Sequence, residues 1–432
     1  MSDNVRYFLK NFLNLVFLRI ISRIIPIVMM TYYIIPIIGF SSFGKLEFAK
    51  VLNYFFKIII SYGFVYSIPK IFYDNKDNKN FKNDDLGKIN GSILFIRLLL
   101  ILFCALILLI FFLLSDVIKN EFDVIFYFFL VAISSGLFPI CIYQGIEKIH
   151  IVTILNTLTK LLFYLTIPLY IKSKEDVCYY PIAYSIVEFL RLLLSYFILI
   201  YFYKIHIEIP KIEDIKKHIF DGFSGFSFSF YLLLYNNFPM LFLKMYFGNT
   251  AVGLYKLGTY ISQIIQQILE PFLQCFYPIV NKKIKTDIND GLKFSINILG
   301  VNIIISTLIC VICCTFPDKI IMFFCGSKID SSKITEIVQI LKINSITVFF
   351  TILSSYIGVQ ILRSLGYKIL YSIFLCISFM LSLILHFKFV VKGGIIASMY
   401  SILTCEILLF TMVFIVFMYI IFLKFKKNNN IL

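Results

Sequence analysis

Basic side chains stand inside long apolar stretches in the first half of this chain. Arg19 and Arg23 are one helical turn apart in the first stretch, so a helix places both guanidinium groups on one face. Lys57 lies near the middle of the second stretch. Two guanidinium groups with a nearby ammonium suit the oxygens of a phosphate, and charges in an apolar span need a partner or a cavity. We therefore expect a cationic cavity that can bind phosphate.

Other ionisable residues in the apolar stretches have both structural and functional explanations. Arg191 follows Glu188 by three residues, so the two can form an ion pair within one helix. Glu270 precedes Pro271, where a helix kink frees backbone groups that need partners, although a proton-coupling or cation-coupling carboxylate is the alternative. The remaining candidates for coupling or structural charges are Glu47, Lys160 and Glu406.

No pattern in the chain predicts a catalytic centre, a metal site or a bound cofactor. The four histidines are scattered near the ends of apolar stretches, and no Gly-rich phosphate loop is present. Cysteines lie mostly within apolar runs, where a thiol behaves as a small hydrophobic group. We therefore do not expect an enzyme.

The composition is that of an integral membrane protein. The chain has 432 residues, of which 60% are hydrophobic and 15% charged, and its mean hydropathy is +0.91. That leaves too little polar surface to cover a soluble globule of this size. The net charge of +16 is explained largely by the excess of Lys and Arg in cytoplasmic loops of membrane proteins, so we do not expect a nucleic acid partner.

The apolar runs are about 20 residues long, which is the length that an α-helix needs to cross a bilayer. We expect an all-α polytopic protein with about twelve transmembrane helices, over residues 11–38, 46–69, 91–115, 124–146, 150–171, 179–203, 219–243, 252–279, 292–316, 336–360, 369–387 and 394–423. With the N-terminus inside, the cytoplasmic segments carry 20 Lys and Arg residues and the outer loops carry 10. Both termini are therefore expected in the cytoplasm.

A repeated spacing of glycine and proline divides the chain into two halves. The spacing of Gly39, Gly44 and Pro69 recurs 209 positions later at Gly248, Gly253 and Pro278. The charge does not repeat, because Glu47 and Lys57 correspond to Lys256 and Gln266 at this offset. The repeat therefore predicts a duplicated scaffold in which the first half carries most of the buried positive charge.

A polar segment separates the two copies of the repeat and is expected to be a cytoplasmic linker over residues 204–218. It follows an N-terminal lobe of six helices over 1–203 and precedes a C-terminal lobe of six helices over 219–432. Because each half has an even number of spans, the lobes would be related by a pseudo-twofold axis along the membrane normal. That arrangement encloses a central cleft.

Short motifs resemble those of the polysaccharide-biosynthesis flippases of the O-antigen (Wzx) type. The resemblance covers most of the chain and is weakest in the last three spans. The motifs that carry it are Tyr143-Gln144-Gly145-Ile146-Glu147-Lys148, the segment from Asn156 to Lys160, Tyr235-Asn236-Asn237, Gly253-Leu254-Tyr255 and Phe276-Tyr277-Pro278.

This resemblance implies the multidrug/oligosaccharidyl-lipid/polysaccharide (MATE-like) exporter superfamily and alternating access between two lobes. The implied function is to translocate an undecaprenyl-pyrophosphate-linked oligosaccharide, the O-antigen repeat unit, from the cytoplasmic to the periplasmic leaflet of a bacterial inner membrane. In the related lipid II flippases, basic residues of the first, second and eighth helices face the cavity. The corresponding ligands of the pyrophosphate here would be Arg19, Arg23, Lys57 and Lys256.

Many members carry a small residue at the position of Lys256, which leaves the role of this lysine open. The implied partners are the lipid-linked oligosaccharide and the phospholipid bilayer, with a polysaccharide polymerase and a chain-length regulator as further candidates. No cofactor is expected, while coupling to H⁺ or Na⁺ stays open.

Two other functions compete with this one. A cation-coupled drug antiporter of the same superfamily would favour an acidic cavity, whereas the first half of this chain offers more buried bases than acids. A polytopic O-antigen polymerase would be an enzyme with a long extracytoplasmic loop, and the longest such loop expected here, 317–335, is modest.

Overall fold

The computed structural model describes residues 25–26, 28–74, 83–325 and 331–429. Within this range it leaves undescribed the side chains of residues 83–84, 264–278, 282, 285, 325, 331–332, 368 and 423–429. The described residues fold into helices joined by short turns and contain no β-strand. The expected class, an all-α polytopic membrane protein, is confirmed.

Nine helical stretches of the described residues are long and apolar enough to cross a membrane. Some of these stretches hold more than one expected span, namely Met29–Asp74, Ile212–Gln263 and Ile369–Phe422. Each of these three contains a glycine at which the helix breaks. Because the breaks interrupt the helices without a separating loop, the count of twelve spans stays a prediction.

The glycine breaks share one backbone conformation. Gly39 has φ 78° and ψ 169°, and Gly248 has φ 76° and ψ −167°. Side chains with a Cβ atom avoid this region, so glycine is the residue that can turn a helix here. A third break, at Gly394, has φ 62° and ψ −147°. The 209-residue repeat is therefore reproduced in the backbone at Gly39 and Gly248.

Contacts divide the chain into two units, Met1–Leu241 and Phe242–Leu432. This division falls within a single long helix, α10 (Ile212–Thr286). The expected lobes over 1–203 and 219–432 and the linker over 204–218 concern topology across the membrane, which contacts do not test. They stay a prediction.

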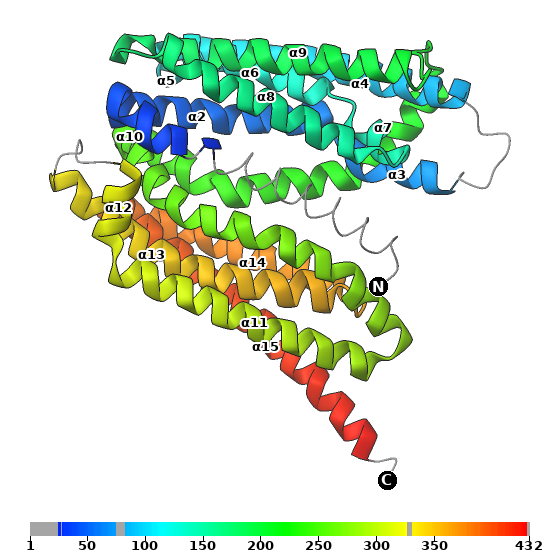
Figure 1. Cartoon of the computed structure of the whole chain (residues 1–432), viewed down its shortest axis with the longest axis vertical. Helices are drawn as coiled ribbons and strands as arrows, with labels where there is room; N and C mark the ends of the chain where they lie inside the picture. Colours follow the sequence, from blue (N-terminus) through cyan, green and yellow to red (C-terminus); the bar gives the residue numbers. More distant parts are fainter. Residues whose placement is uncertain (1–24, 27, 75–82, 326–330, 430–432) are drawn as a thin grey trace. The chain divides into compact units, whose positions relative to one another are not determined.

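The first unit is a bundle in which α2 packs along α6, α6 packs against α9, and α9 packs against α8 (Figure 1). The short helices α3 and α7 pack against each other. Its elements are η1 (Met29–Ile34), α2 (Ile35–Ser61), α3 (Phe64–Asp74), α4 (Asn83–Leu114), α5 (Asp116–Asn120), α6 (Phe122–Leu137), α7 (Ile140–Gly145), α8 (Ile149–Tyr170), η2 (Lys174–Cys178), α9 (Tyr179–Tyr201) and the beginning of α10.

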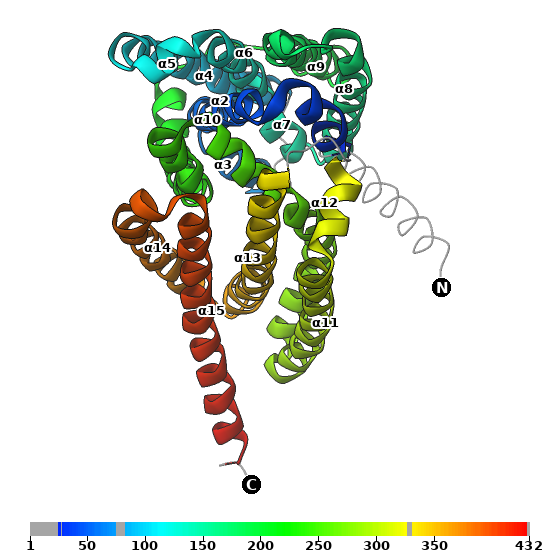
Figure 2. The ribbon, with the colours of Figure 1, turned by 90° about the vertical axis from the view of Figure 1, so that its left-hand side faces the viewer.

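The second unit is built in the same manner, with α13 packed against both α11 and α15, and with α15 packed against α14 (Figure 2). Its elements are the remainder of α10, α11 (Ile288–Thr315), α12 (Pro317–Cys325), α13 (Ser331–Ser355), η4 (Tyr356–Leu362), α14 (Lys368–Leu385), η5 (His386–Val390) and α15 (Val391–Asn429).

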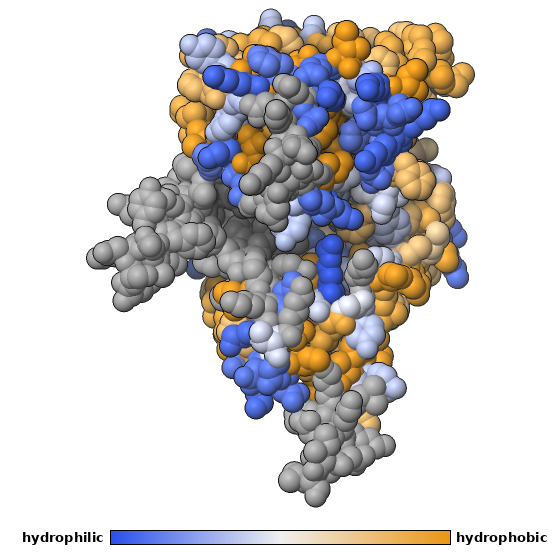
Figure 3. Space-filling view, turned by 90° about the vertical axis from the view of Figure 1, so that its right-hand side faces the viewer, coloured by the Kyte–Doolittle hydropathy of each residue, from blue (hydrophilic) through white to orange (hydrophobic). Residues whose placement is uncertain are grey.

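The outer surfaces of the helices are apolar, as a bilayer requires. Figure 3, which looks at one end of the helices, shows hydrophilic residues in large areas beside apolar ones, whereas exposed apolar residues line the sides of the helices. On α4, for example, Leu102, Leu106 and Leu113 are exposed along one side of the helix. In water such exposed side chains would promote aggregation, whereas in a membrane they contact lipid tails.

Candidate functional site

Three of the residues singled out in the sequence cannot be placed. Arg19 and Arg23 lie outside the described residues, and Glu270 lies in the part of α10 whose side chains are not described. Their expected roles stay predictions. The charges that can be placed in the first unit lie mainly on α2, α8 and α9.

One face of α2 carries a row of polar side chains. Glu47, Lys50, Tyr54 and Lys57 are three or four residues apart, which is the spacing of one helix face. Glu47 and Lys50 are buried, and the Nζ atom of Lys50 lies 2.6 Å from Oε1 of Glu47. Burying this pair is tolerable because each group offsets the charge of the other.

Lys50 also contacts aromatic residues of α8 and α9. Its Nζ atom lies 4.9 Å from the centroid of the Tyr180 ring, a cation–π contact. The hydroxyl of Tyr180 is 3.2 Å from that of Tyr164 on α8. Three helices therefore meet around this ammonium. The sequence analysis missed Lys50, and its spacing from Glu47 is the signal that could have found it.

Arg191 ties α9 to α8. It forms the ion pair that the sequence predicted with Glu188, and it also donates a hydrogen bond to Oδ1 of Asn156 on α8. Its guanidinium carbon lies 4.4 Å from the centroid of the Phe138 ring. Arg191 and Glu188 are only 8% and 4% exposed. The guanidinium group is therefore held on three sides by protein.

Lys57 differs from these charges because it has no compensating group of its own. It is half-buried near the end of α2, and within the described part of the chain it forms neither a hydrogen bond nor an ion pair. Its ammonium lies within electrostatic range of Arg191 and Glu188. Since Glu188 is already paired with Arg191, Lys57 leaves this group with a net charge of about +1 in surroundings of low dielectric.

Arg97 is a buried cation that the sequence analysis also missed. It is 1% exposed on α4, and its guanidinium group donates hydrogen bonds to the carbonyl oxygens of Leu137 and Phe138, at 3.1 and 3.3 Å. These carbonyls lack helical partners because α6 ends there, ahead of Pro139. Arg97 therefore has a structural role, and an arginine amid leucines in an apolar run was its only signal in the sequence.

The remaining candidates lie in different places. Lys160 is half-buried on α8, one turn from Asn156, and so belongs to the same bundle as Lys57. Lys256 belongs to the second unit, where its Nζ atom lies 4.8 Å from the centroid of the Tyr260 ring. Glu406 is buried on α15, within electrostatic range of Tyr371 on α14.

The first unit therefore presents a half-buried ammonium on α2 within electrostatic range of the Glu188–Arg191 pair of α9, and Asn156 of α8 holds that pair in place. The family model described as polysaccharide biosynthesis protein matches residues 8–283, more than half of the chain. The chain belongs to this family. Membership confirms the resemblance found in the sequence and makes the chain a multi-pass membrane protein of polysaccharide biosynthesis.

Other proteins are similar to this chain in sequence or in fold. A protein of Escherichia coli (strain K12) described as "Putative O-antigen transporter" is 22% identical over 404 residues, covering 93% of this chain and 92% of that protein. Among solved structures, the lipid II flippase MurJ in an inward closed conformation has a TM-score of 0.69 and 14% identity, covering 92% of this chain and 85% of that one.

An inward-facing multidrug resistance transporter of the MATE family, in the MOP superfamily, has a TM-score of 0.64 and 13% identity, covering 94% of this chain and 93% of that one. At these identities the two structures show a shared fold. None of the three similar proteins is described as an enzyme, so the alternative of a polymerase is not favoured.

Proposed function

We propose that this protein is a flippase that moves an undecaprenyl-pyrophosphate-linked oligosaccharide, the O-antigen repeat unit, from the cytoplasmic to the periplasmic leaflet of a bacterial inner membrane by alternating access. Membership of the polysaccharide biosynthesis family supports this proposal, as do the similar O-antigen transporter and the fold shared with a lipid II flippase. Together they support the proposal of a lipid-linked saccharide as the cargo.

The observation that carries the proposal is the uncompensated charge of Lys57. A pyrophosphate brings several negative charges into a region where water is scarce, and a nearby cation lowers the free energy of that step. Arg191 is held by Glu188 and Asn156, so it contributes a fixed positive field, while Lys57 remains able to contact the phosphate oxygens directly. Arg19, Arg23 and Lys256 stay proposed as further ligands.

A cation-coupled drug antiporter is the second candidate, because the MATE transporters share the fold. The charge of Lys57 favours the flippase, since an uncompensated ammonium repels a cationic drug and attracts a pyrophosphate. Coupling to H⁺ or Na⁺, and contacts with a polysaccharide polymerase and a chain-length regulator, belong to the proposal as well.

Replacing Lys57 tests this function. In a strain whose own copy of the gene is deleted, Lys57→Gln is expected to lower the surface polysaccharide about 10- to 100-fold, the effect of losing one hydrogen bond to a charged group. Lys57→Arg keeps the charge and is expected to retain most of the activity. The measurement is the amount of surface polysaccharide per amount of protein in the membrane.

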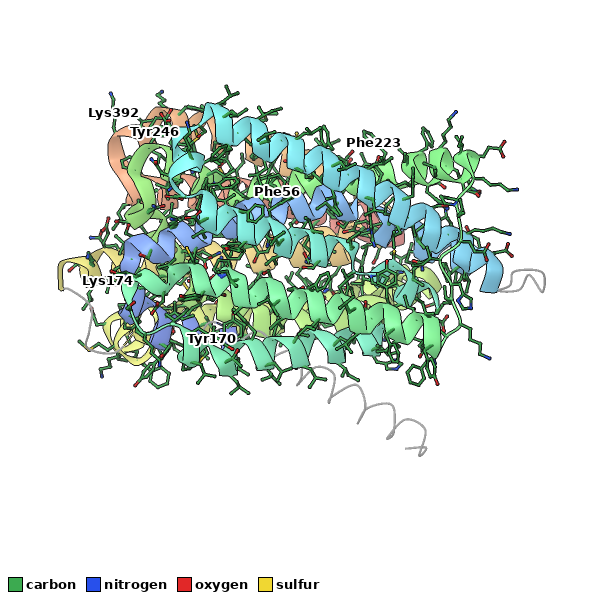
Figure 4. The ribbon with its side chains drawn as sticks, turned by 90° about the horizontal axis from the view of Figure 1, so that it is seen from above. Phe56, Tyr170, Lys174, Phe223, Tyr246 and Lys392 are labelled. Atoms are coloured by element: carbon green, nitrogen blue, oxygen red, sulfur yellow. The ribbon has the colours of Figure 1, made fainter. Side chains whose placement is uncertain are left out.

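Lys174 provides the matched control, because it is an exposed lysine at one end of the first unit's helices (Figure 4). Lys174→Gln is expected to leave the polysaccharide unchanged. A full level of polysaccharide in the Lys57→Gln strain would contradict the proposal. Acquired resistance to cationic drugs, with no change in polysaccharide, would favour the antiporter instead.

The proposed topology, with both termini in the cytoplasm, can be tested by thiol labelling. His206 is exposed after α9 and Lys172 is exposed before η2, so cysteines at these positions report the two sides of the membrane. In intact spheroplasts, a membrane-impermeant reagent is expected to label Lys172→Cys above the level of the unsubstituted chain. Labelling of His206→Cys is expected only after permeabilisation, and the reverse pattern would overturn the topology.

A further inference from the structure

Tyr54 combines an exposed ring with a hydroxyl that lies among buried charges. The side chain is 44% exposed on α2, between Lys50 and Lys57. It is within electrostatic range of Lys50 and Glu47 on its own helix, and of Tyr184 on α9. Lipid tails cannot solvate such groups. A ring whose hydroxyl is near such groups is better suited to a polar, hydrated surface than to lipid.

The two residues that follow Tyr54 in the sequence are packed, and Tyr54 is not. The ring of Phe55 contacts that of Phe230 at 5.8 Å between centroids, and the ring of Phe56, labelled in Figure 4, contacts that of Phe129 at 5.1 Å. Within the described residues, Tyr54 has neither a ring partner nor a hydrogen bond. An aromatic ring of this size left open beside a charged interior is available for a ligand.

Lys57 lies three residues after Tyr54, so the two side chains are neighbours on the surface of α2, with Cβ atoms about 5 to 6 Å apart. In a polyprenyl-pyrophosphate-linked saccharide the first sugar ring is bonded directly to a phosphate. The ring and the phosphate are therefore separated by a distance of the same order. An ammonium and an open aromatic face at this spacing match the two adjacent parts of such a molecule.

We propose that Tyr54 is a stacking platform for the first sugar of the cargo, bound while Lys57 contacts the pyrophosphate. This inference rests on the proposed flippase function and assigns it a saccharide subsite. The C–H groups on one face of a pyranose ring pack against the negative face of the tyrosine ring.

The chain contains no tryptophan, so Y54W introduces a single indole whose fluorescence reports this position alone. The purified full chain in nanodiscs is titrated with two probes, a polyprenyl pyrophosphate carrying one N-acetylhexosamine and the same polyprenyl pyrophosphate without sugar. Binding of both probes is measured separately by calorimetry. We expect both to bind, and only the sugar-bearing probe to change the indole emission.

Y179W is the control, because Tyr179 is 52% exposed at the beginning of α9, and its emission is expected to be the same with either probe. Equal changes in Y54W emission with both probes, or no change while both bind, would overturn the platform and leave the flippase function standing. Failure of the unsubstituted protein to bind either probe would overturn both.

Two further variants separate the ring from its hydroxyl and do not depend on the bulk of tryptophan. Y54F keeps the stacking face, so transport in cells is expected to remain near the level of the unsubstituted protein. Y54A removes the face and is expected to lower transport about 2- to 10-fold, the usual range for an aromatic contact. Equal transport by Y54A and Y54F, at equal protein levels, would overturn the proposal.

Discussion

Replacing Gly63 by alanine is expected to destabilise the first unit by about 3 kcal/mol or more. A Cβ atom at this position would lie 1.8 Å from the carbonyl oxygen of Gly222 and 2.6 Å from the backbone nitrogen of Phe226. Both obstacles are backbone atoms of α10, so no rotation of a side chain can relieve the clash. The turn between α2 and α3 would have to move away from α10.

That movement would also disrupt the aromatic contacts beside the glycines. The ring of Tyr62 stacks on that of Phe226 with 5.0 Å between centroids, and the ring of Tyr66 contacts that of Phe228 at 6.4 Å. The measurement is thermal unfolding of the purified protein in detergent, followed by the exposure of buried cysteines to a thiol-reactive dye.

Gly300 gives a matched control within the same chain. It lies in α11, and a Cβ atom there would meet nothing within 4 Å. Gly300→Ala is therefore expected to be neutral, or stabilising by up to about 1 kcal/mol through its helix propensity. If Gly63→Ala and Gly300→Ala unfolded at the same temperature, the close approach of α10 to this turn would be refuted.

Removal of Arg191 is expected to cost about 3 to 5 kcal/mol, because Glu188 would stay buried without its ion-pair partner. The substitution Arg191→Leu keeps an apolar stem and removes the guanidinium group, which also frees Asn156. The double substitution of both Glu188 and Arg191 by leucine is expected to cost less than Arg191→Leu alone, because it leaves no buried carboxylate without its hydrogen-bonded partner.

An exposed pair with the same spacing serves as the control. The Nζ atom of Lys88 lies 3.3 Å from Oδ1 of Asp85, and the two side chains are 45% and 40% exposed. Lys88→Leu is expected to change the free energy of unfolding by less than about 1 kcal/mol. Equal unfolding temperatures for Arg191→Leu and Lys88→Leu would show that the Glu188–Arg191 pair of α9 is not buried in the folded protein.

Local spacing was enough to predict some features of this molecule. The apolar runs predicted an all-α membrane protein, and the recurrence of Gly39 at Gly248 predicted a repeated feature that the backbone reproduces. The pair of Glu188 and Arg191 was predicted because three residues on a helix bring side chains together. Each of these inferences rests on spacing along the chain and needs no knowledge of which helices pack together.

Contacts between helices could not be predicted in the same way. Lys50 contacts the ring of Tyr180, which lies 130 positions later in the chain. The carbonyl oxygens that accept hydrogen bonds from Arg97 lack helical partners only because α6 ends before Pro139. Lys57 lacks an ion-pair partner among the described residues because Arg191 already pairs with Glu188, and this too depends on how the helices pack together. Lys256 was grouped with Lys57 by resemblance as a ligand of the pyrophosphate. It lies in the second unit, as its position in the second half of the chain implied, and its role stays a prediction.

The matching torsions at Gly39 and Gly248 are what an internal gene duplication would leave behind. A half-length ancestor would have had to pair with a second copy of itself, and every charge in it would then have appeared twice. Fusion of the two copies removed that constraint, because each residue could then mutate without a change at the corresponding position of the other copy. The offset that matches the glycines sets Glu47 opposite Lys256 and Lys57 opposite Gln266, and such differences require that the two copies be encoded separately, as they are in this chain.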